Sequence, residues 1–479
     1  MTDQTTARLP LEGIRVLELG MVFVLPAAVS PLAGMGADVV KIESEARPEG
    51  TRSWPQPDDQ PREDLYNYGG AFHMLNRNKR GITIDLSTSQ GRDLLLRLVA
   101  VSDVVAENFT PRVLRNLNLT YDCLREVNPN IILLSSNGFG QSGPWTNYKS
   151  YGPITEAIDG LMELTGYPDG PPQRSGGGGL GVTFPDIAGA YFGTFAMLAA
   201  LERRQRTGHG EWLDLSHMEA GVATIPEAIV DYTMNGRVRG RIANRDPGRA
   251  PQGVYPCEGS DRWIAISVAS DEQFKSLVDM LSLRSLATDE RFGTSVARHS
   301  NHDELDELII EATRTRCAED LERELQAAGV EAAVVANARD VWLDPQLRHR
   351  SFFEMVPAPG ATPEIEPRPF ARQGWKMSGA DPYTRRQAPN FGEHTREVLQ
   401  EYLSLDDGEV EHLLADLTAE GVIADRPRAG IFGREPRDPA QMLNDGLLQE
   451  IDEDFQARLR SHLQGGGATP GSATDLGAD

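Results

Sequence analysis

Short runs rich in β-branched residues alternate with helical segments over the first 150 residues. Strands are predicted at 13–19, 37–43, 81–86, 103–109 and 130–140, and helices at 91–102 and 113–127. Strands that alternate with helices in this way are typical of a parallel sheet with helices on its faces. The hydrophobic pattern therefore predicts an α/β fold.

The pattern changes after residue 185. An apolar helix is predicted at 186–205, because basic residues and Gly208 supply the usual signals for a helix C-terminus. A strand at 211–216, a second helix at about 216–235 and a polar, turn-rich connector at 239–253 follow. Beyond the connector, a strand at 262–268 and helical stretches to about residue 327 predict a smaller domain.

These elements divide the chain into four predicted segments. Residues 1–235 form a large domain, and residues 236–330 form the connector and the small domain. Residues 331–404 return to complete the large domain, and residues 405–479 are an acidic C-terminal extension. The last sixteen residues are rich in Gly, Ala, Ser and Thr, so we predict that they are disordered.

Composition and charge exclude several classes of function. The chain has 479 residues and a net charge of −24, which argues against nucleic-acid binding because that requires a basic surface. The three cysteines form no CxxC pair, so we predict no metal site, no disulfide framework and a reducing cytoplasm. The longest apolar run, 187–201, is shorter than the ~20 residues that span a membrane, and the N-terminus has no signal-peptide pattern.

A run of glycines precedes the long helix. Gly176, Gly178 and Gly181 fit the spacing G-x-G-x-x-G, but the fingerprint of a dinucleotide site requires a strand directly before it. The preceding segment, PDGPPQRS, contains prolines that a central strand does not tolerate. We therefore do not interpret the glycine run as a nucleotide site. The segment GQSG at 140–143 also departs from the G-x-S-x-G pattern of a nucleophilic serine.

Asp186 is a single acid at the start of the long helix, and two interpretations of it remain open. Asp is a favoured N-cap, so its side chain would accept a hydrogen bond from the first helical turn. Gly189 and Gly193 lie one turn apart in the same helix, where each costs about 1 kcal/mol relative to Ala. Such spacing indicates that another backbone or a ligand comes close. The helix dipole would keep Asp186 ionised, and an ionised carboxylate with room around it can act as a nucleophile.

Basic residues gather at 76–81, in the segment NRNKRG. Arg77, Lys79 and Arg80 form either a solvated turn before a strand or a patch that binds phosphate or carboxylate groups.

Taken together, these segments resemble the class III CoA-transferases, the family of formyl-CoA transferase and carnitine CoA-transferase. The resemblance covers roughly residues 11–405. It rests on the order of the segments LEGIRVLEL, GADVVKIE, NRNKRGITIDL, DVVAENFTP, NPNIILLSSNGFGQSGP, GLMELTGYPDGPP, PDIAGAYFGTFAMLAALERRQRTGHGE and APNFGEHTREVL.

The resemblance implies that Asp186 is the catalytic nucleophile. Asp186 would attack an acyl-CoA to give a mixed anhydride, and the CoA thiolate would return to form an aspartyl-CoA thioester. An acceptor carboxylate would then reverse these steps and leave as the new acyl-CoA. The exchange of one thioester for another is nearly thermoneutral, so coenzyme A is the only cofactor expected and no metal is needed. The role of Gly176–Gly179, in a loop about five residues longer than usual, stays open.

The resemblance also implies a binding site for CoA, with an adenine side and a substrate end. The residues that match the family's CoA-binding positions are Phe23, Val24, Ile84, Asn108, Phe109, Thr110, Arg112 and Lys149. Three positions depart from the family pattern. Asn116 stands where the family has a basic residue, for which Arg112 or Arg115 is close enough to substitute. Phe23 stands where formyl-CoA transferase has a glutamine, beside Val24 and Leu25, and Gly152 stands where the family has a glutamate. The apolar residues favour a medium-sized, largely apolar acid over oxalate.

Fold, partners and alternatives follow from the same resemblance. We expect a Rossmann-like large domain with a parallel sheet, a smaller α+β domain, and a ring-shaped protomer of an interlocked homodimer or a heteromer. One alternative is a 2-methylacyl-CoA racemase of the same fold, but Tyr151 stands where that enzyme has a catalytic histidine. A second alternative is a catalytically silent subunit of a heteromeric CoA-transferase, against which the presence of Asp186 argues.

Overall fold

The computed structural model describes residues 8–53, 64–175, 182–356, 368–431, 438–455 and 457–458. The chain forms two compact units, one from residues 1–162, 174–236 and 348–479 and the other from residues 163–173 and 237–347. The glycine run and the last sixteen residues, both singled out by the sequence, lie outside the described residues. The four predicted segment boundaries remain a proposal.

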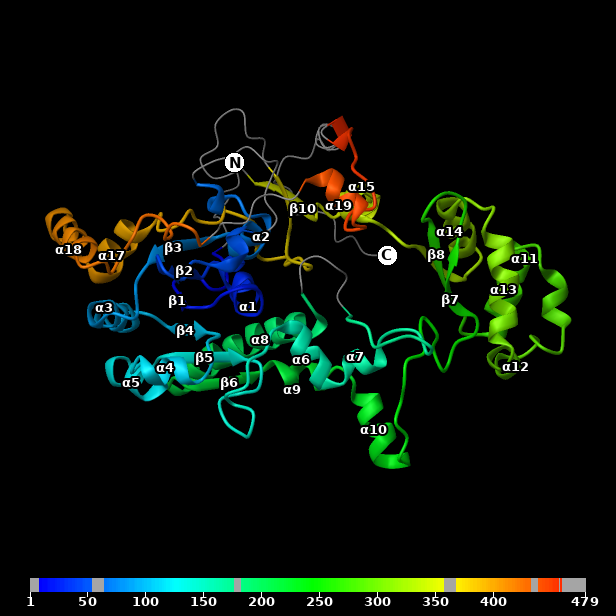
Figure 1. Cartoon of the computed structure of the whole chain (residues 1–479), viewed down its shortest axis with the longest axis horizontal. Helices are drawn as coiled ribbons and strands as arrows, with labels where there is room; N and C mark the ends of the chain where they lie inside the picture. The colour runs from blue at the N-terminus through cyan, green and yellow to red at the C-terminus, as the bar shows by residue number, and fades with distance from the viewer. Residues whose placement is uncertain are drawn as a thin grey trace. The chain divides into compact units, whose positions relative to one another are not determined.

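A six-stranded sheet organises the first unit (Figure 1). All neighbouring strands are parallel, and their order is β3-β2-β1-β4-β5-β6, the order of dinucleotide-binding α/β folds. The predicted parallel sheet is therefore confirmed. The strands are β1 (Arg15–Glu18), β2 (Asp38–Glu43), β3 (Lys79–Thr83), β4 (Val104–Glu107), β5 (Ile132–Asn137) and β6 (Trp212–Ser216).

Successive strand residues alternate between two buried cores, because side chains along a strand point to opposite faces. In β1, Val16 belongs to the core formed with α1 (Val24–Gly34) and α8 (Phe184–Thr207), and Leu17 belongs to the core on the other face. The second core includes α3 (Ser89–Val99), α5 (Tyr121–Val127), α17 (Thr395–Leu403) and α18 (Asp407–Ala419). Both faces of the sheet are thus covered, as parallel sheets require.

Two predicted helices are each interrupted. The helix predicted at 113–127 is α4 (Arg112–Asn116) followed by α5, with Asn118 at φ +54° between them. The helix predicted at 216–235 is α9 (His217–Val222) followed by α10 (Pro226–Asn235), where Pro226 begins a new helix. Helices of the described residues that were not predicted include α1, α2 (Gly70–Asn76), α6 (Gly152–Asp159) and α7 (Leu161–Leu164), and also α17 and α18 near the C-terminus. Short 3₁₀ turns lie at Gly50–Ser53 and Leu65–Asn67.

The C-terminal segment completes the edge of the large sheet. The His394 amide donates to the Gly81 carbonyl of β3 at 2.9 Å, and the Asp85 amide donates to Val422 at 2.7 Å. A hairpin of β10 (Phe353–Val356) and β11 (Arg368–Ala371) and the short helix α19 (Pro439–Asn444) belong to the same unit. Residues far apart in sequence therefore share one core.

The second unit is a small antiparallel sheet with helices. Its strands are ordered β7-β8-β9, and Ile264 and Ile266 of β8 lie in the core between this sheet and the helices. The elements are β7 (Gln252–Pro256), β8 (Trp263–Ser267), α11 (Asp271–Met280), a 3₁₀ turn (Arg284–Thr288), α12 (Ser295–Ser300), α13 (His302–Thr313), α14 (Ala318–Ala327), β9 (Glu331–Val334) and α15 (Ala338–Leu343), with α16 (Pro345–His349) at its end.

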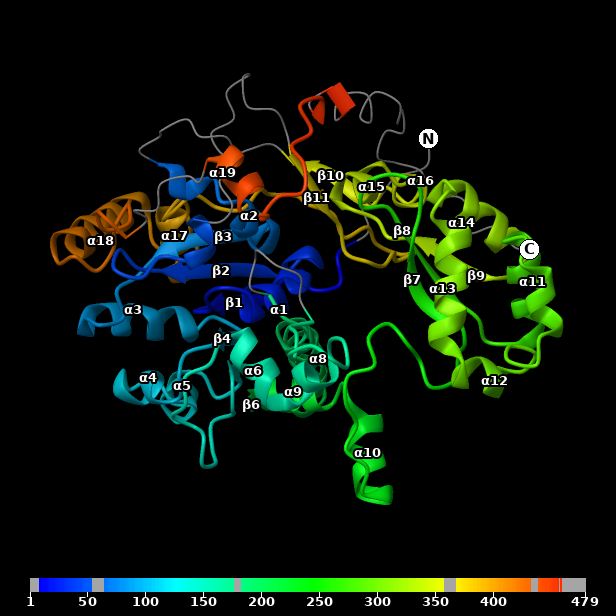
Figure 2. The same ribbon diagram turned by 45° about the vertical axis from the view of Figure 1, so that its right-hand side comes forward.

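Helix α8 is the central apolar helix of the first unit. It is longer than the apolar run suggested, and among the described helices it alone is long and apolar enough to cross a membrane by length and composition. Core helices of soluble proteins meet the same criteria, and α8 lies against α1, β5 and β6 (Figure 2). Its helical glycines make this approach possible, because a Cβ on Gly193 would lie 3.2 Å from Ala28 Cβ and 3.3 Å from Leu215 Cδ2.

Candidate active site

Asp186 lies in the first turn of α8 and is only 7% exposed. The N-cap of α8 is Thr183, so the interpretation of Asp186 as the N-cap is wrong. Asp186 occupies the third helical position, and its side chain reaches back to form a capping box. The amide and the hydroxyl of Thr183 donate to Asp186 Oδ2 at 2.9 and 3.2 Å. Within the described residues, no hydrogen bond to Oδ1 is found.

Gly152, the first residue of α6, lies directly against this carboxylate. A Cβ built on Gly152 would be 2.1 Å from Asp186 Oδ2 and 2.7 Å from Thr183 Oγ1. A residue with a side chain at position 152 would therefore push the carboxylate and the hydroxyl apart. Glycine at this position therefore allows Thr183 and Asp186 to keep their contact, which the glutamate expected from the family resemblance would disturb.

The electrostatic environment of Asp186 opposes ionisation. Burial raises the pKa of Asp186, the Thr183 hydrogen bonds lower it in part, and the nearby Glu156 raises it further. The net pKa of Asp186 therefore lies above its ordinary value, because loss of hydration outweighs the groups that favour the charged form, and the expectation that the helix dipole keeps Asp186 ionised stays a prediction. Glu156 is fully buried, and its Oε1 accepts the Ser175 amide at 2.7 Å. Ser175 Oγ in turn accepts the Phe184 amide at 3.2 Å, so Ser175 links Glu156 to the first residue of α8.

The β1–α1 loop lies at the carboxyl end of the sheet, near α8. In a sheet of this order, the point between β1 and β4 is where the strand order reverses and where ligands bind. Asn108, directly after β4, exchanges two hydrogen bonds with the backbone of Met21, at 2.9 and 2.8 Å. Val24 approaches α8 at Gly189, where a Cβ would lie 3.2 Å from Val24 Cγ1. The loop therefore connects the switch point to the helix that carries Asp186.

This loop contains an unusual backbone conformation. Val22 has a φ of +69°, a region that β-branched residues rarely adopt. Glu49 Oε1 accepts the Val22 amide at 2.7 Å, and Lys41 Nζ donates to the Gly20 carbonyl at 2.9 Å. Both charged groups are fully buried. They hold the loop in a shape that its own residues do not favour.

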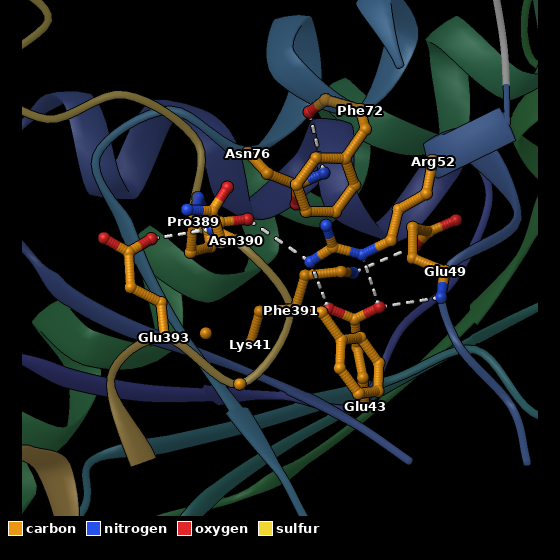
Figure 3. A network of polar contacts seen from close by, with 12 residues as sticks. Lys41, Glu43, Glu49, Arg52, Phe72, Asn76, Pro389, Asn390, Phe391 and Glu393 are labelled. Carbon is orange, nitrogen blue, oxygen red and sulfur yellow. Dashed lines mark hydrogen bonds and ion pairs between the residues drawn. The ribbon is translucent and has the colours of Figure 1, made fainter. Parts of the chain in front are cut away.

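Those charges belong to a buried ionic network, part of which is shown in Figure 3. Lys41 pairs with Glu18 at 3.0 Å and with Glu49 at 2.9 Å, and Lys79 pairs with Glu18 at 2.7 Å. Burial acts to lower the pKa of Lys41, but Glu18, Glu49 and Glu43 outweigh burial and raise it. Beside this cluster, Arg52 lies over the Phe72 ring and pairs with Glu43 at 2.6 Å (Figure 3). Each of these buried charges thus has an opposite charge within ion-pair distance, as buried charges require.

The hypothesis of a basic binding patch at 76–81 is wrong. Lys79 is buried and paired with Glu18, and it also donates to the Pro26 carbonyl at 3.0 Å. Arg80 pairs with Asp38, with Glu397 at 3.0 Å and with Glu401 at 2.7 Å. Arg77 Nη2 donates to the Ala371 carbonyl at 2.6 Å. Lys79 and Arg80 are β3 residues with internal partners, so the solvated-turn interpretation is wrong as well.

The residues expected to bind CoA are found in three environments. Phe23 is partly exposed, whereas Val24, Leu25 and Ile84 are buried in the cores. Asn108, Phe109 and Thr110 follow β4 and are partly exposed. Arg112 and Lys149 are exposed and form no ion pair with another described residue. The structure thus brings Phe23, Val24 and Asn108 to one edge of the sheet, and the CoA assignments remain predictions.

Other chemistry near the site is structural. Ser136 Oγ and His217 Nε2 lie 2.8 Å apart, but both residues are buried, and burial lowers the pKa of His217 to about 4. Within the described ranges, no group of three or more His, Cys, Asp or Glu residues could hold a metal ion.

Three residues of the site were missed at the level of sequence: Thr183, Glu156 and Glu49. The segment TFPD fits the capping-box pattern, in which Ser or Thr precedes an acid by three positions before an apolar run, so Thr183 could have been found. Glu156 and Glu49 have no local signal, because their partners Ser175 and Val22 are distant in sequence.

Comparison with known proteins matches most of this chain to CoA-transferases. Residues 11–395 match the profile of CoA-transferase family III. The chain is 33% identical over 406 residues to succinate–glutarate CoA-transferase of Agrobacterium fabrum, covering 85% of this chain and 99% of that protein. It is 34% identical to succinyl-CoA–D-citramalate CoA-transferase of Chloroflexus aurantiacus, with 87% and 99% covered, and 32% identical to acetyl-CoA:oxalate CoA-transferase of Acetobacter aceti, with 84% and 98% covered.

A solved structure supports the same assignment. A CAIB/BAIF family protein from Brucella suis superimposes with a TM-score of 0.74 at 33% identity, covering 82% of this chain and 100% of that one. The chain therefore belongs to CoA-transferase family III. It is a family III CoA-transferase that acts on acyl-CoA and carboxylate substrates.

Proposed function

We propose that this enzyme transfers CoA from an acyl-CoA donor to a carboxylic acid through a covalent intermediate on Asp186. The observation that carries the proposal is the buried carboxylate, which accepts hydrogen bonds at one oxygen and none from any described residue at the other. Desolvation makes a carboxylate a stronger nucleophile and excludes the water that would hydrolyse an anhydride or thioester. The proposed intermediates are, in order, a mixed anhydride with the donor acid, an aspartyl-CoA thioester and a second anhydride with the acceptor acid.

Replacement of Asp186 tests this mechanism. We expect Asp186→Ala to lose at least about 10³-fold in kcat, as removal of a covalent nucleophile does, while the protein stays folded. Wild-type enzyme incubated with succinyl-CoA and then hydroxylamine should carry a hydroxamate at Asp186, identified by peptide mass spectrometry. Glu409→Ala is the matched control, because Glu409 holds the same capping-box position at the exposed start of α18. Substantial transfer by Asp186→Ala would exclude the mechanism.

Phe23 is the residue on which we base the choice of acceptor. Val24 and Leu25 are buried, so only Phe23 of the three apolar residues is positioned to meet a substrate. A phenyl ring offers no hydrogen bond to a second polar group, and an unpaired polar group costs about 1–3 kcal/mol in a closed site. We propose a medium-sized acid with an aliphatic or aromatic body. The test is to measure kcat/KM with one donor for oxalate, succinate and a phenyl or branched-chain acid. A tenfold preference for oxalate would contradict the proposed acceptor.

We further propose how the chain contacts CoA, how it assembles and where it is located. The exposed cations Arg112 and Lys149 are suited to the phosphates of CoA, since they have no internal partner among the described residues. Tyr191 and Phe195 of α8 are 69% and 71% exposed, which fits the interlocked homodimer of a cytoplasmic enzyme. Native mass spectrometry of the purified chain should give a dimer, and activity of the chain alone would contradict a silent subunit.

The racemase alternative lacks support at Tyr151. Its side chain is 73% exposed and offers a phenol where the racemase has an imidazole, the usual general base. Deuterium incorporation at the α-carbon of a 2-methylacyl-CoA would reverse this conclusion.

A further inference from the structure

We infer that Thr183 is a catalytic residue whose hydroxyl and amide stabilise negative charge on Asp186 Oδ2 when the aspartyl carbonyl is attacked. This inference rests on the proposed function and adds a role for a residue that touches a reacting atom. The evidence is the geometry around one oxygen. Thr183 N and Oγ1 lie 2.9 and 3.2 Å from Oδ2, and both residues are buried.

The two oxygens of Asp186 enter the reaction differently. In the first step, an electron pair on Oδ1 attacks the carbonyl carbon of the acyl-CoA, the carbon–sulfur bond breaks, and CoA leaves as a thiolate. The negative charge of this step develops on the donor's carbonyl oxygen. Oδ2 becomes the carbonyl oxygen of the aspartyl half of the anhydride.

The next two steps place the charge on Oδ2. The thiolate attacks Asp186 Cγ, the electron pair of the Cγ–Oδ2 double bond moves onto Oδ2, and the donor acid leaves with Oδ1. The acceptor carboxylate then attacks Cγ of the thioester, the charge again develops on Oδ2, and the thiolate leaves. Finally, the thiolate attacks the acceptor's acyl carbon and releases the Asp186 carboxylate. No proton is gained or lost in any step.

Two donors already aimed at Oδ2 form the arrangement of an oxyanion hole. They require no reorganisation at the moment of attack, because the capping box holds the Thr183 amide and the first turn of α8 holds Asp186. Gly152 lies beside both groups, and a Cβ there would enter the space of Oδ2 and Thr183 Oγ1. The absence of a side chain at position 152 therefore preserves the contact on which the inference depends.

A plain capping role makes a different prediction for the same residue. If Thr183 only starts α8, its replacement would misplace Asp186, so the first attack of Oδ1 on the acyl-CoA would decline together with the two later attacks on Cγ. If Thr183 stabilises charge on Oδ2, its hydroxyl matters most when Cγ is attacked. Loss of the hydroxyl would also raise the pKa of Asp186, because a donor to the carboxylate is removed.

The test compares Thr183→Val with Thr183→Ser. Val keeps the β-branched shape and the amide but removes the hydroxyl, and Ser keeps the hydroxyl. Each protein is loaded with succinyl-CoA, freed of small molecules, and mixed with succinate in a quench-flow instrument. The readouts are the intact mass of the CoA adduct and the rate at which succinyl-CoA is formed from it. Thr294→Val is the matched control, since Thr294 is the exposed N-cap of α12 in the second unit.

We expect Thr183→Val to reach the same final level of CoA adduct but to form it and to transfer it about 100-fold more slowly, the lower end of the range for loss of one oxyanion donor. The acid limb of the pH profile of kcat/KM should move to higher pH, and Thr183→Ser should transfer at close to the wild-type rate. Wild-type transfer rates in Thr183→Val, equal slowing in Thr183→Ser, or loss of the adduct would each overturn the inference. If the wild-type enzyme forms no adduct with any acyl-CoA that it turns over, the proposed function itself fails.

Discussion

At the scale of single residues, the site is a carboxylate kept in a poorly hydrated place. Burial raises the pKa of Asp186, and the Glu156 carboxylate adds to the effect. The cost of ionisation is partly offset at Oδ2 by Thr183. A nucleophile that is ionised but weakly solvated is well suited to attack a thioester.

This environment predicts the pH dependence of the reaction. Asp186 must be deprotonated to attack, and its pKa is raised, so the acid limb of kcat/KM should lie above the ordinary Asp value of about 3.9. Glu156→Gln removes the like charge while its amide oxygen can still accept the Ser175 amide. We therefore expect the limb to move to lower pH in Glu156→Gln, measured with one saturating co-substrate.

The control for this experiment is Glu163→Gln, because Glu163 is an exposed acid of α7. It should leave the acid limb unchanged. An unchanged acid limb of the pH profile of kcat/KM in Glu156→Gln would show that Glu156 does not raise the pKa of Asp186.

At the scale of secondary structure elements, the packing of α8 against α1 places the site. Gly189 and Gly193 let α8 approach α1 and β6, as a Cβ at either position would meet side chains at 3.2–3.3 Å. The helical glycines were singled out from spacing alone, and the prediction of a close neighbour is confirmed. The neighbours are protein groups, Val24 and His217 at Gly189 and Ala28 and Leu215 at Gly193.

We expect Gly193→Leu to destabilise the protein by about 1–3 kcal/mol or more, because an overpacked helix interface must shift. The better helix propensity of Leu offsets only about 1 kcal/mol. Urea unfolding followed by circular dichroism measures the change. Gly240→Leu, where no atom lies within 4 Å of the built Cβ, is the control and should change stability by less than about 0.5 kcal/mol. Equal effects of the two substitutions would contradict the packing argument.

At the scale of the whole molecule, the buried ionic network joins segments from both ends of the chain. Arg52 pairs with Glu43 and donates to the Pro389 carbonyl at 3.3 Å (Figure 3). The Phe391 amide donates to Asn67 Oδ1 at 2.9 Å. Lys41 extends the network to the β1–α1 loop. The return segment and the candidate substrate loop therefore depend on the same set of buried charges.

Lys41→Met should reduce the free energy of unfolding by about 3–5 kcal/mol, because it leaves Glu18 and Glu49 buried with one cation fewer. It should also raise KM, since the loop that contains Val22 and Phe23 loses its contact at Gly20. Thermal unfolding and steady-state kinetics measure both effects. Arg323→Met, which removes an exposed pair with Asp320, should change stability by less than about 1 kcal/mol. A stable Lys41→Met variant with unchanged KM would contradict this account.

The sequence by itself determined the parallel sheet, the long helix, the family and the candidate nucleophile. These follow from local signals: strand and helix periodicity in one segment, and an ordered set of motifs along the chain. Asp186 was found in this way, although its capping role was assigned to the wrong position of α8, because the N-cap depends on the backbone of Thr183 rather than on the acid alone.

Only the tertiary structure decided which charges are used for folding and which remain for chemistry. Lys79 and Arg80 read as a binding patch in sequence, but their partners Glu18, Asp38, Glu397 and Glu401 come from β1, β2 and α17. The raised pKa of Asp186 and the role of Gly152 likewise depend on α6, which packs on α8 from about thirty residues away. The physical reason is that desolvation and ion pairing depend on distance in space, and the pattern of residues along the chain does not encode that distance.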